Sequence, residues 1–396
     1  MKGKDQSFTW SEGWWLEGDK AWFVNGMCNI LFGVDLNTGE CDQVACIPNP
    51  EKETESQNPY CTKCGNDIYC IPGIGGSIWI YNLDNKVFTE LKIDRPGQHA
   101  PGSQFWIWNG SIFIVAANWN KIIEISIDQR KITNYYTICE GDSVRRSVLV
   151  CDKIYAVSSE SGTIYQFDLS TKKVEMYLHP EMAKKAFAIG FDGERFWLCG
   201  YYQEAYVWDK KNDNLTTVEF SDDLEMHNLN ESIKCTGKAP EAPMFGQVAA
   251  MGKYIWFIPI MAEKIVYINK ETAAICVFDL YEEDKMNISP RKCQGIGNYI
   301  IQYIKDNRYI GLFSARNSRI LEIDTEQLIY RWKEYYFSER YLQQYCETCK
   351  GIYYEGEDLL CTYAYHMDKL TAHYKTNSAD TVGMKIYTKL TGENAR

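Results

Sequence analysis

The stretch RSVLVCDKIYAVSSESGTIYQFDLSTKKVEMYL, residues 146–178, decides the fold. It contains four short runs rich in β-branched and aromatic residues: SVLV, KIYAVSS, GTIYQFDL and KVEMYL. Turn-forming residues separate these runs, at Cys151-Asp152, at Glu160-Ser161-Gly162 and at Ser170-Thr171-Lys172. The pattern predicts four antiparallel strands joined by tight turns. A single sheet of this size cannot bury both of its faces, so it needs neighbouring sheets.

Near-copies of this four-strand unit occur on both sides of it. The clearest marker is the end of the third strand, where an apolar run closes in an Asp or Asn turn, at Asp35, Asn82, Asp128, Asp168, Asp209, Asn269 and Asp324. Asp and Asn suit this position because their side chains accept hydrogen bonds from the backbone two residues on. A second-strand run precedes each marker, and successive second strands start 42 to 59 residues apart, a spacing typical of propeller repeats.

These repeats predict an all-β fold, a β-propeller formed by residues 1–396 as a single domain. Seven units are clear, and a weaker eighth follows in GIYYEGEDLLCTYAYH (351–366) and GMKIYTKLTGE (383–393). The N-terminal run DQSFTW (5–10) has no partner of its own, so we expect this strand to complete the last blade and close the ring. Eight blades are the favoured prediction, and seven blades with a C-terminal appendage are the alternative.

In outline, the pattern resembles the WD40, kelch and YVTN propellers. It lacks the Gly-His and Trp-Asp pairing of the WD40 repeat, apart from a single Trp208-Asp209, and it lacks the double glycine of kelch. The resemblance covers nearly the whole chain. It implies the propeller fold and carries no function with it.

Composition and charge argue against several classes of protein. The net charge of −11 disfavours a general binder of nucleic acid or anionic membranes, because both need a basic surface. No apolar run forms a signal peptide or reaches the roughly 18 residues of a membrane span. The 15 cysteines lie mostly in predicted strands. A secreted chain would seldom carry so many unpaired thiols, so we expect a soluble protein of bacterial type in a reducing cytoplasm.

The connections between units are longer than those within units, and in a propeller they emerge on one face around the mouth of the central channel. We therefore expect polar side chains at the start of the inner strands to surround this mouth. The candidates are Gln104, Arg146, Lys185 and Gln247 at strand starts, His99, Arg145 and Gln294 in the adjacent loops, and Trp119 as a stacking platform for a sugar or a partner. Converging donors suit an anionic or sugar-like ligand. The alternative is that they hydrate a water-filled channel.

Chemistry at cysteine or histidine has weaker support. Two CxxC pairs, Cys61/Cys64 and Cys346/Cys349, fall in units 2 and 8, and such pairs bind zinc or act in redox reactions when four thiolates or a reactive pair converge. Their separation in the ring favours a structural role. The five histidines show no metal-ligand spacing, and no catalytic motif is present, so we expect no metal and no cofactor.

The sequence therefore favours a non-catalytic scaffold that binds a protein partner or a small glycan or anionic ligand at the channel mouth. It predicts no nucleic-acid and no membrane partner, and it leaves the oligomeric state open. One alternative is a carbohydrate-active enzyme, a glycoside hydrolase or lyase, whose carboxylates meet at the same mouth. The second is a metal or redox function of the CxxC pairs.

Overall fold

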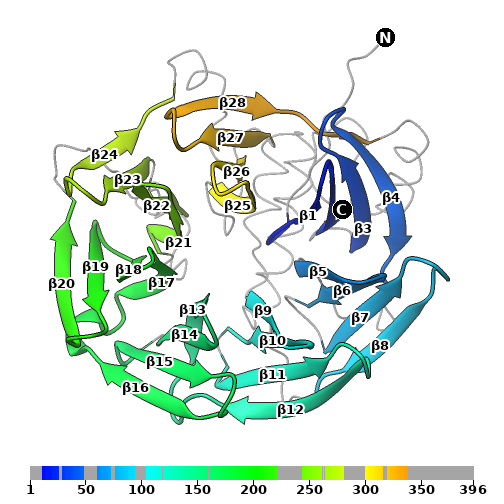
Figure 1. Ribbon diagram of the computed structural model, residues 1–396, viewed down its shortest axis with the longest axis horizontal. Helices are drawn as coiled ribbons and strands as arrows, with labels where there is room; N and C mark the ends of the chain where they lie inside the picture. Colours follow the sequence, from blue (N-terminus) through cyan, green and yellow to red (C-terminus); the bar gives the residue numbers. More distant parts are fainter. Residues whose placement is uncertain are drawn as a thin grey trace, which may run out of the picture.

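The computed structural model describes residues 11–25, 29–48, 60–72, 76–94, 104–117, 119–158, 160–220, 243–260, 262, 264–280, 299–314 and 319–337. Within these residues the chain forms seven antiparallel sheets around a common axis (Figure 1). Each sheet, or blade, takes four consecutive strands in order from the axis to the rim. The β-propeller predicted from the repeats is thus confirmed.

The strands, blade by blade from the inner to the outer edge, have the following bounds. They are β1 (Trp15–Glu17), β2 (Lys20–Asn25), β3 (Ile30–Asp35) and β4 (Glu40–Cys46); β5 (Tyr60–Cys64), β6 (Asp67–Ile71), β7 (Ser77–Asn82) and β8 (Phe88–Lys92); β9 (Gln104–Trp108), β10 (Ser111–Val115), β11 (Lys121–Ser126) and β12 (Lys131–Thr137); β13 (Val144–Val150), β14 (Lys153–Ser158), β15 (Thr163–Asp168) and β16 (Val174–Leu178); β17 (Ala186–Phe191), β18 (Phe196–Gly200), β19 (Glu204–Asp209) and β20 (Asn214–Glu219); β21 (Phe245–Met251), β22 (Tyr254–Pro259), β23 (Ile265–Asn269) and β24 (Ile275–Phe278); β25 (Tyr299–Lys305), β26 (Tyr309–Ser314), β27 (Ile320–Asp324) and β28 (Ile329–Lys333). A 3-10 turn, η1 (Pro180–Met182), precedes β17, and a further strand, β29 (Tyr336–Phe337), follows β28.

The stretch 146–178 forms the fourth blade, in which β13 starts at Val144 and the other strands lie where the pattern predicts them. Middle strands such as β14 and β22 are buried along almost their whole length, whereas the outer strand β16 is mostly exposed. Middle strands are buried on both faces because each blade packs between two others. One such cluster joins Tyr155 of the fourth blade to Phe196 and Trp208 of the fifth.

Two segments close the ring between the seventh and the first blade. Trp14, just before β1, is 7% exposed, and its ring lies 4.9 Å from Phe23 of the first blade and 5.6 Å from Tyr303 of the seventh. Tyr335 lies 5.0 Å from the same indole. At the rim, β29 pairs in parallel with β4, with Tyr336 opposite Glu40. Both the inner and the outer edges of the first blade are therefore fastened to the end of the seventh.

The prediction of eight blades was wrong, and the alternative of seven is confirmed for the described residues. The blade β25–β28 lies directly beside the blade β1–β4, because the chain after β28 adds to the rim of the first blade instead of starting a new inner strand. The segments assigned to the eighth unit and its closing strand, 351–366, 383–393 and 5–10, lie outside the described residues. That residues 1–396 form a single domain stays a prediction.

The Asp and Asn markers act as expected in most blades. The Oδ1 atom of Asp168 accepts the backbone N–H groups of Ser170 at 2.9 Å and Thr171 at 2.7 Å, and Asp35, Asn82, Asp209, Asn269 and Asp324 cap their turns in the same way. The third blade departs from this pattern. There β11 ends at Ser126, whose hydroxyl accepts the N–H of Gln129, and not at Asp128 as the sequence predicts.

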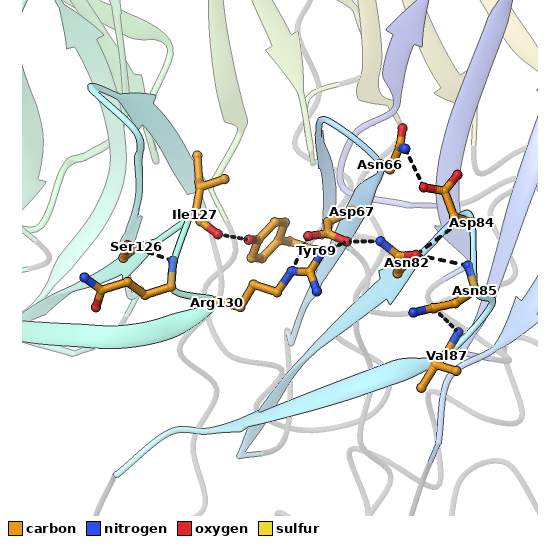
Figure 2. A network of polar contacts seen from close by, with 11 residues as sticks. Asn66, Asp67, Tyr69, Asn82, Asp84, Asn85, Val87, Ser126, Ile127 and Arg130 are labelled. Atoms are coloured by element: carbon orange, nitrogen blue, oxygen red, sulfur yellow. Dashed lines mark hydrogen bonds and ion pairs between the residues drawn. The ribbon is translucent and has the colours of Figure 1, made fainter.

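The same turns also connect neighbouring blades. Figure 2 shows Arg130, in the turn between β11 and β12, beside Asp67 at the start of β6. The Nε atom of Arg130 lies 2.6 Å from one carboxylate oxygen of Asp67, and a terminal guanidinium nitrogen lies 3.0 Å from the other. Asn82 donates to the same carboxylate at 2.7 Å. This two-pronged pair, with Asp67 nearly buried, fixes the third blade against the second.

These turns give a first prediction, that Asp168→Ala destabilises the fold more than Asp128→Ala. The Thr171 and Ser170 N–H groups, with Lys153, lower the pKa of Asp168 to about 2. A lowered pKa in the folded state means that this carboxylate contributes stability above its unfolded pKa and loses it as the pH falls toward 2. Thermal unfolding at neutral pH should give a lower Tm for Asp168→Ala than for Asp128→Ala. Equal melting temperatures would contradict this assignment of the turns.

No helix within the described residues is long and apolar enough to cross a membrane.

Candidate functional site

The inner strands of four adjacent blades are irregular, three at their N-terminal ends and β25 at its middle. β13, β17, β21 and β25 each pair with the next strand through a register shift, at Val144/Ser147, Ala186/Ala188, Phe245/Gln247 and Ile301/Tyr303. A β-bulge of this kind places an extra residue against the partner strand and redirects the neighbouring side chains. Because inner strands of successive blades run in the same direction, the three N-terminal bulges lie toward one end of the channel.

A cavity of about 300 Å³ lies between these strands. Its polar lining includes Gln104 of the third blade, Arg146 of the fourth, Gln247 of the sixth and Gln302 of the seventh, together with Glu12 from the segment before β1. Ile189, Val248, Ile301 and Ile304 supply apolar lining. The cavity is therefore shared by most of the ring, and it combines a few polar groups with an aliphatic wall, as ligand-binding cavities do.

The side-chain oxygens of Gln104 and Gln247 are committed to the neighbouring blade. The Oε1 atom of Gln104 accepts hydrogen bonds from the backbone N–H and the hydroxyl of Ser147. The Oε1 atom of Gln247 accepts the N–H of Ile301 at 2.8 Å. Among the described residues neither amide NH₂ group has a hydrogen-bond partner. The orientation of each amide is thus fixed by its oxygen, and the NH₂ groups remain available to a ligand.

Gln302 has a different task. It is 2% exposed and holds the segment that carries Glu12. Its NH₂ group donates to the carbonyl of Ser11 at 2.8 Å, its Oε1 atom accepts the Ser11 hydroxyl at 3.0 Å, and its backbone oxygen accepts the N–H of Trp14 at 2.6 Å. These bonds on both sides of Glu12 fix its backbone beside the channel.

Glu12 and Arg146 form an ion pair across the channel. One guanidinium nitrogen lies 3.3 Å from one carboxylate oxygen, and the two side chains are only 16% and 14% exposed. Burial opposes the charged form of Arg146, but Glu12 and the hydroxyl of Tyr60 outweigh burial and raise the pKa of Arg146. Burial in turn raises the pKa of Tyr60. Three separate parts of the chain, before β1, in β5 and in β13, meet at this pair.

The structure brings together three of the eight residues proposed from the sequence, Gln104, Arg146 and Gln247. The Nζ atom of Lys185 instead lies 3.6 Å from the Oε1 atom of Glu204. Trp119 packs on the apolar cluster between the second and third blades. Arg145 lies over the ring of Phe187. None of Lys185, Trp119 and Arg145 is among the residues that line the cavity. His99 and Gln294 lie outside the described residues. Ligand binding by any of these residues stays a prediction.

Sequence reasoning missed Glu12 and Gln302. Gln302 has a recognisable signal, a lone amide within the apolar run YIIQYI, and it lies in the bulge of its inner strand. The repeat markers at the third strands do not locate the inner strand of the seventh unit, so they do not single out this amide. Glu12 has no such signal, because only the closure of the ring brings it beside Arg146, which lies 134 residues away in sequence.

The first CxxC pair does not form a thiol site. Cys61 belongs to the apolar cluster between the first and second blades, whereas Cys64 packs on the opposite face, against the third blade. Residues three apart in a strand point to opposite faces, so these two thiols cannot share a metal or form a disulfide. Burial raises the pKa of Cys61 to about 12 and that of Cys64 to about 11, so both stay protonated and unreactive. Cys346 and Cys349 lie outside the described residues.

A second polar cavity, of about 240 Å³, lies where the seventh blade meets the first. Here Tyr303, Gly311, Glu322 and Arg331 are aligned across successive strands. A Cβ atom at Gly311 would lie 2.3 Å from the Tyr303 ring, so only glycine lets this ring cross the sheet. The Tyr303 hydroxyl donates to Glu322 at 2.8 Å, and Arg331 and Lys333 pair with the same carboxylate.

No metal-binding group of three or more His, Cys, Asp or Glu residues occurs in the part of the chain that the structure describes.

No protein-family model matches the sequence, and no curated protein matches it. Among solved structures, a streptogramin B lyase is similar over 79% of this chain and 92% of its own, with 17% sequence identity and a TM-score of 0.54. A chain in the crystal structure of a mitotic checkpoint complex is similar over 84% of this chain and 90% of its own, with 7% identity and a TM-score of 0.53. Identities this low show a shared fold and no more. The seven described blades and these similarities show that the fold of this chain is a β-propeller.

Proposed function

We propose that this propeller is a non-catalytic scaffold that binds a small, acceptor-rich ligand in the central cavity. The observation that carries the proposal is the pair of amide groups at Gln104 and Gln247, whose oxygens are held by the next blade and whose NH₂ groups are left without a described partner. Donors fixed before a ligand arrives lose little conformational entropy on binding, which favours affinity.

The composition of the cavity supports binding over catalysis. A glycoside hydrolase needs two carboxylates on either side of the scissile bond. Among the described residues that line the cavity, Glu12 is the single carboxylate, and it is already paired with Arg146. The similarity to a streptogramin B lyase, at 17% identity, supplies no catalytic residue to this chain. The enzyme alternative therefore has less support than the binding scaffold.

Two further parts of the proposal concern location and partners. We place the protein in a reducing cytoplasm, which is supported by seven described cysteines that are free thiols, among them the buried Cys70 and Cys199 and the exposed Cys151. A protein partner at the same face is the second candidate, favoured by the fold that this chain shares with a component of a mitotic checkpoint complex. Such a partner would cover the cavity, so ligand and partner would compete.

The test separates the amide donor from the amide acceptor. Gln104→Glu and Gln247→Glu each keep an oxygen for Ser147 or Ile301 but remove the NH₂ donor. In a thermal-shift screen of glycans and metabolites on the full chain, the double Glu variant should weaken a wild-type hit by about tenfold or more, since each lost hydrogen bond is worth about 1 kcal/mol.

The matched Ala variants report on structure instead of binding. Gln104→Ala and Gln247→Ala leave the backbone N–H groups of Ser147 and Ile301 without their acceptor, at a cost of about 1–3 kcal/mol each. We expect both Ala variants to melt below their Glu counterparts. Undiminished binding by the double Glu variant would remove these amides from the ligand site and with them the proposed function.

A further inference from the structure

The cavity of about 240 Å³ between the seventh and the first blade carries an excess of positive charge. One carboxylate, that of Glu322, lines it together with three cations, those of Lys305, Arg331 and Lys333. Three positive charges against one negative charge leave an excess of two. The chain as a whole has a net charge of −11, so this cavity differs in sign from the rest of the molecule. A local excess of this kind attracts anions.

The carboxylate of Glu322 holds two of these cations in place without neutralising both. Its Oε1 atom accepts the Nε–H of Arg331 at 2.7 Å and lies 2.5 Å from the Nη2 atom of the same guanidinium. Its Oε2 atom accepts the hydroxyl of Tyr303 at 2.8 Å and lies 2.8 Å from the Nζ atom of Lys333. Both oxygens are thus occupied, and a single negative charge faces two positive ones.

Hydrogen-bond donors remain on all three cations. Lys305 is half-buried at the end of β25, and within the described part of the chain it has no ion-pair partner. Glu322 engages Nε and Nη2 of Arg331, which leaves Nη1, and it takes one of the three N–H groups of Lys333. Asn37, in the turn between β3 and β4, adds a side-chain amide from the first blade. The remaining donors therefore come from both sides of the seam.

A phosphate group suits this set of donors. At neutral pH it carries a charge of about −1.5 to −2, which matches the excess of two positive charges. Guanidinium and ammonium groups are the side chains that proteins use most to bind phosphate. Leu36 is the single aliphatic residue in the lining, so an apolar ligand would find little to contact. The volume of about 240 Å³ lies below the usual range of about 300–1,000 Å³ for ligand cavities, which favours a small ligand.

We propose that this cavity binds a phosphate group, either free phosphate or that of a small phosphate ester, through Lys305, Arg331 and Lys333. The amide of Asn37 donates to the same group from the first blade. The side chain of Arg331 is 68% exposed, so the ligand can reach the site from solvent. A bound phosphate contacts both blades and therefore strengthens the seam that closes the ring.

This site goes beyond the proposed function, because it does not use the central cavity. The linings of the two cavities share Tyr303 alone, and the amides of Gln104 and Gln247 belong only to the central one. Variants in one cavity can therefore be tested against ligands of the other.

The first test uses the wild-type full chain in a phosphate-free buffer of low ionic strength. Isothermal titration calorimetry with inorganic phosphate, glycerol 3-phosphate and nitrate compares two phosphate probes with a monoanion. At least one phosphate probe should bind, and nitrate should bind at least about tenfold more weakly, because it carries less charge and fewer acceptor oxygens. Tighter binding of glycerol 3-phosphate would identify the ligand as an ester, and tighter binding of inorganic phosphate would identify it as the free ion.

The second test changes one cation. Lys305→Gln removes a positive charge without breaking an ion pair among the described residues, and it should weaken phosphate binding by about tenfold or more, because a hydrogen bond to a charged group is lost. Lys305→Arg keeps the charge and should restore most of the affinity. Lys131→Gln is the matched control, because Lys131 is exposed on the outer strand β12 and lies outside the cavity lining. This control should bind phosphate as the wild type does.

Three results would overturn the inference: no binding of either phosphate probe, equal wild-type affinity for phosphate and nitrate, or undiminished phosphate binding by Lys305→Gln. The double variant Gln104→Glu, Gln247→Glu keeps this test apart from that of the proposed function, and it should bind phosphate as the wild type does. If the double variant loses phosphate binding while Lys305→Gln retains it, the anion binds in the central cavity and the site at the seam is wrong.

Discussion

Trp14→Ala is expected to lower the free energy of unfolding by about 3–5 kcal/mol, the range for deleting a fully packed tryptophan. The indole is 7% exposed and contacts Phe23, Tyr303 and Tyr335, which come from both sides of the seam that closes the ring. Its removal costs the transfer free energy of the ring and leaves a cavity at the seam. Urea denaturation of the full chain measures the effect as a lower midpoint.

Two variants control this measurement. Trp14→Phe keeps an aromatic ring beside Phe23 and should recover most of the loss. Met176→Ala removes a side chain that is 70% exposed on the outer strand β16 and should change stability by less than about 0.5 kcal/mol. If Trp14→Ala unfolds at the same urea concentration as Met176→Ala, the seam does not depend on this indole.

Glu322→Ala should have the second-largest effect, about 3 kcal/mol at neutral pH. Breaking a buried ion pair by removing one partner costs about 3–5 kcal/mol. The side chain of Glu322 is 3% exposed, but that of Arg331 is 68% exposed and can return to water, so the lower end of that range applies. The hydroxyl of Tyr303, which donates to Glu322 at 2.8 Å, loses its acceptor as well.

The same carboxylate gives a pH dependence. Burial opposes the ionisation of Glu322, but hydrogen bonds from Lys333 and Tyr303 outweigh burial and hold the pKa of Glu322 below its usual value. A group with a lowered pKa in the folded state stabilises the fold above its unfolded pKa and loses that contribution as the pH falls through the folded pKa. The stability difference between the wild type and Glu322→Gln should therefore be full at neutral pH and shrink below about pH 4.

Urea unfolding at a series of pH values tests this sign. Glu326→Ala is the matched control, because Glu326 is 63% exposed and its ion pair with Arg308 is expected to contribute less than about 1 kcal/mol. If the loss of stability in Glu322→Gln instead grows as the pH falls, the pairing of Glu322 with Arg331 and Lys333 is contradicted.

The four-strand unit was predictable because its determinants are local. Apolar alternation in residues 146–178 and the Asp turn at Asp168 act over a few neighbours, so they can be recognised without knowledge of the rest of the fold. The turn at Asp128 was misplaced by two residues because Ser126 accepts a similar backbone hydrogen bond. Blade number was mispredicted because it depends on which segments meet at closure, and the repeat pattern does not encode that meeting.

The candidate site was also predictable only where its determinants are local. Gln104, Arg146 and Gln247 were recognised because each lies near the start of an inner strand. The bulge in β13 sets Arg145 and Arg146 together against Val157, so neighbouring side chains diverge and only Arg146 lines the cavity. Lys185 precedes β17 and turns to Glu204. A one-residue shift in register decides these cases, and register is not readable from residue type alone.

The sequence by itself determined that this protein is built from repeated four-strand meanders, since strand alternation and turn chemistry operate between residues close along the chain. Only the tertiary structure decided that seven meanders close the ring, and that Glu12 faces Arg146 across it. The physical reason is distance: these two residues are 134 positions apart, and their pairing exists only once the Trp14 seam has joined the last blade to the first.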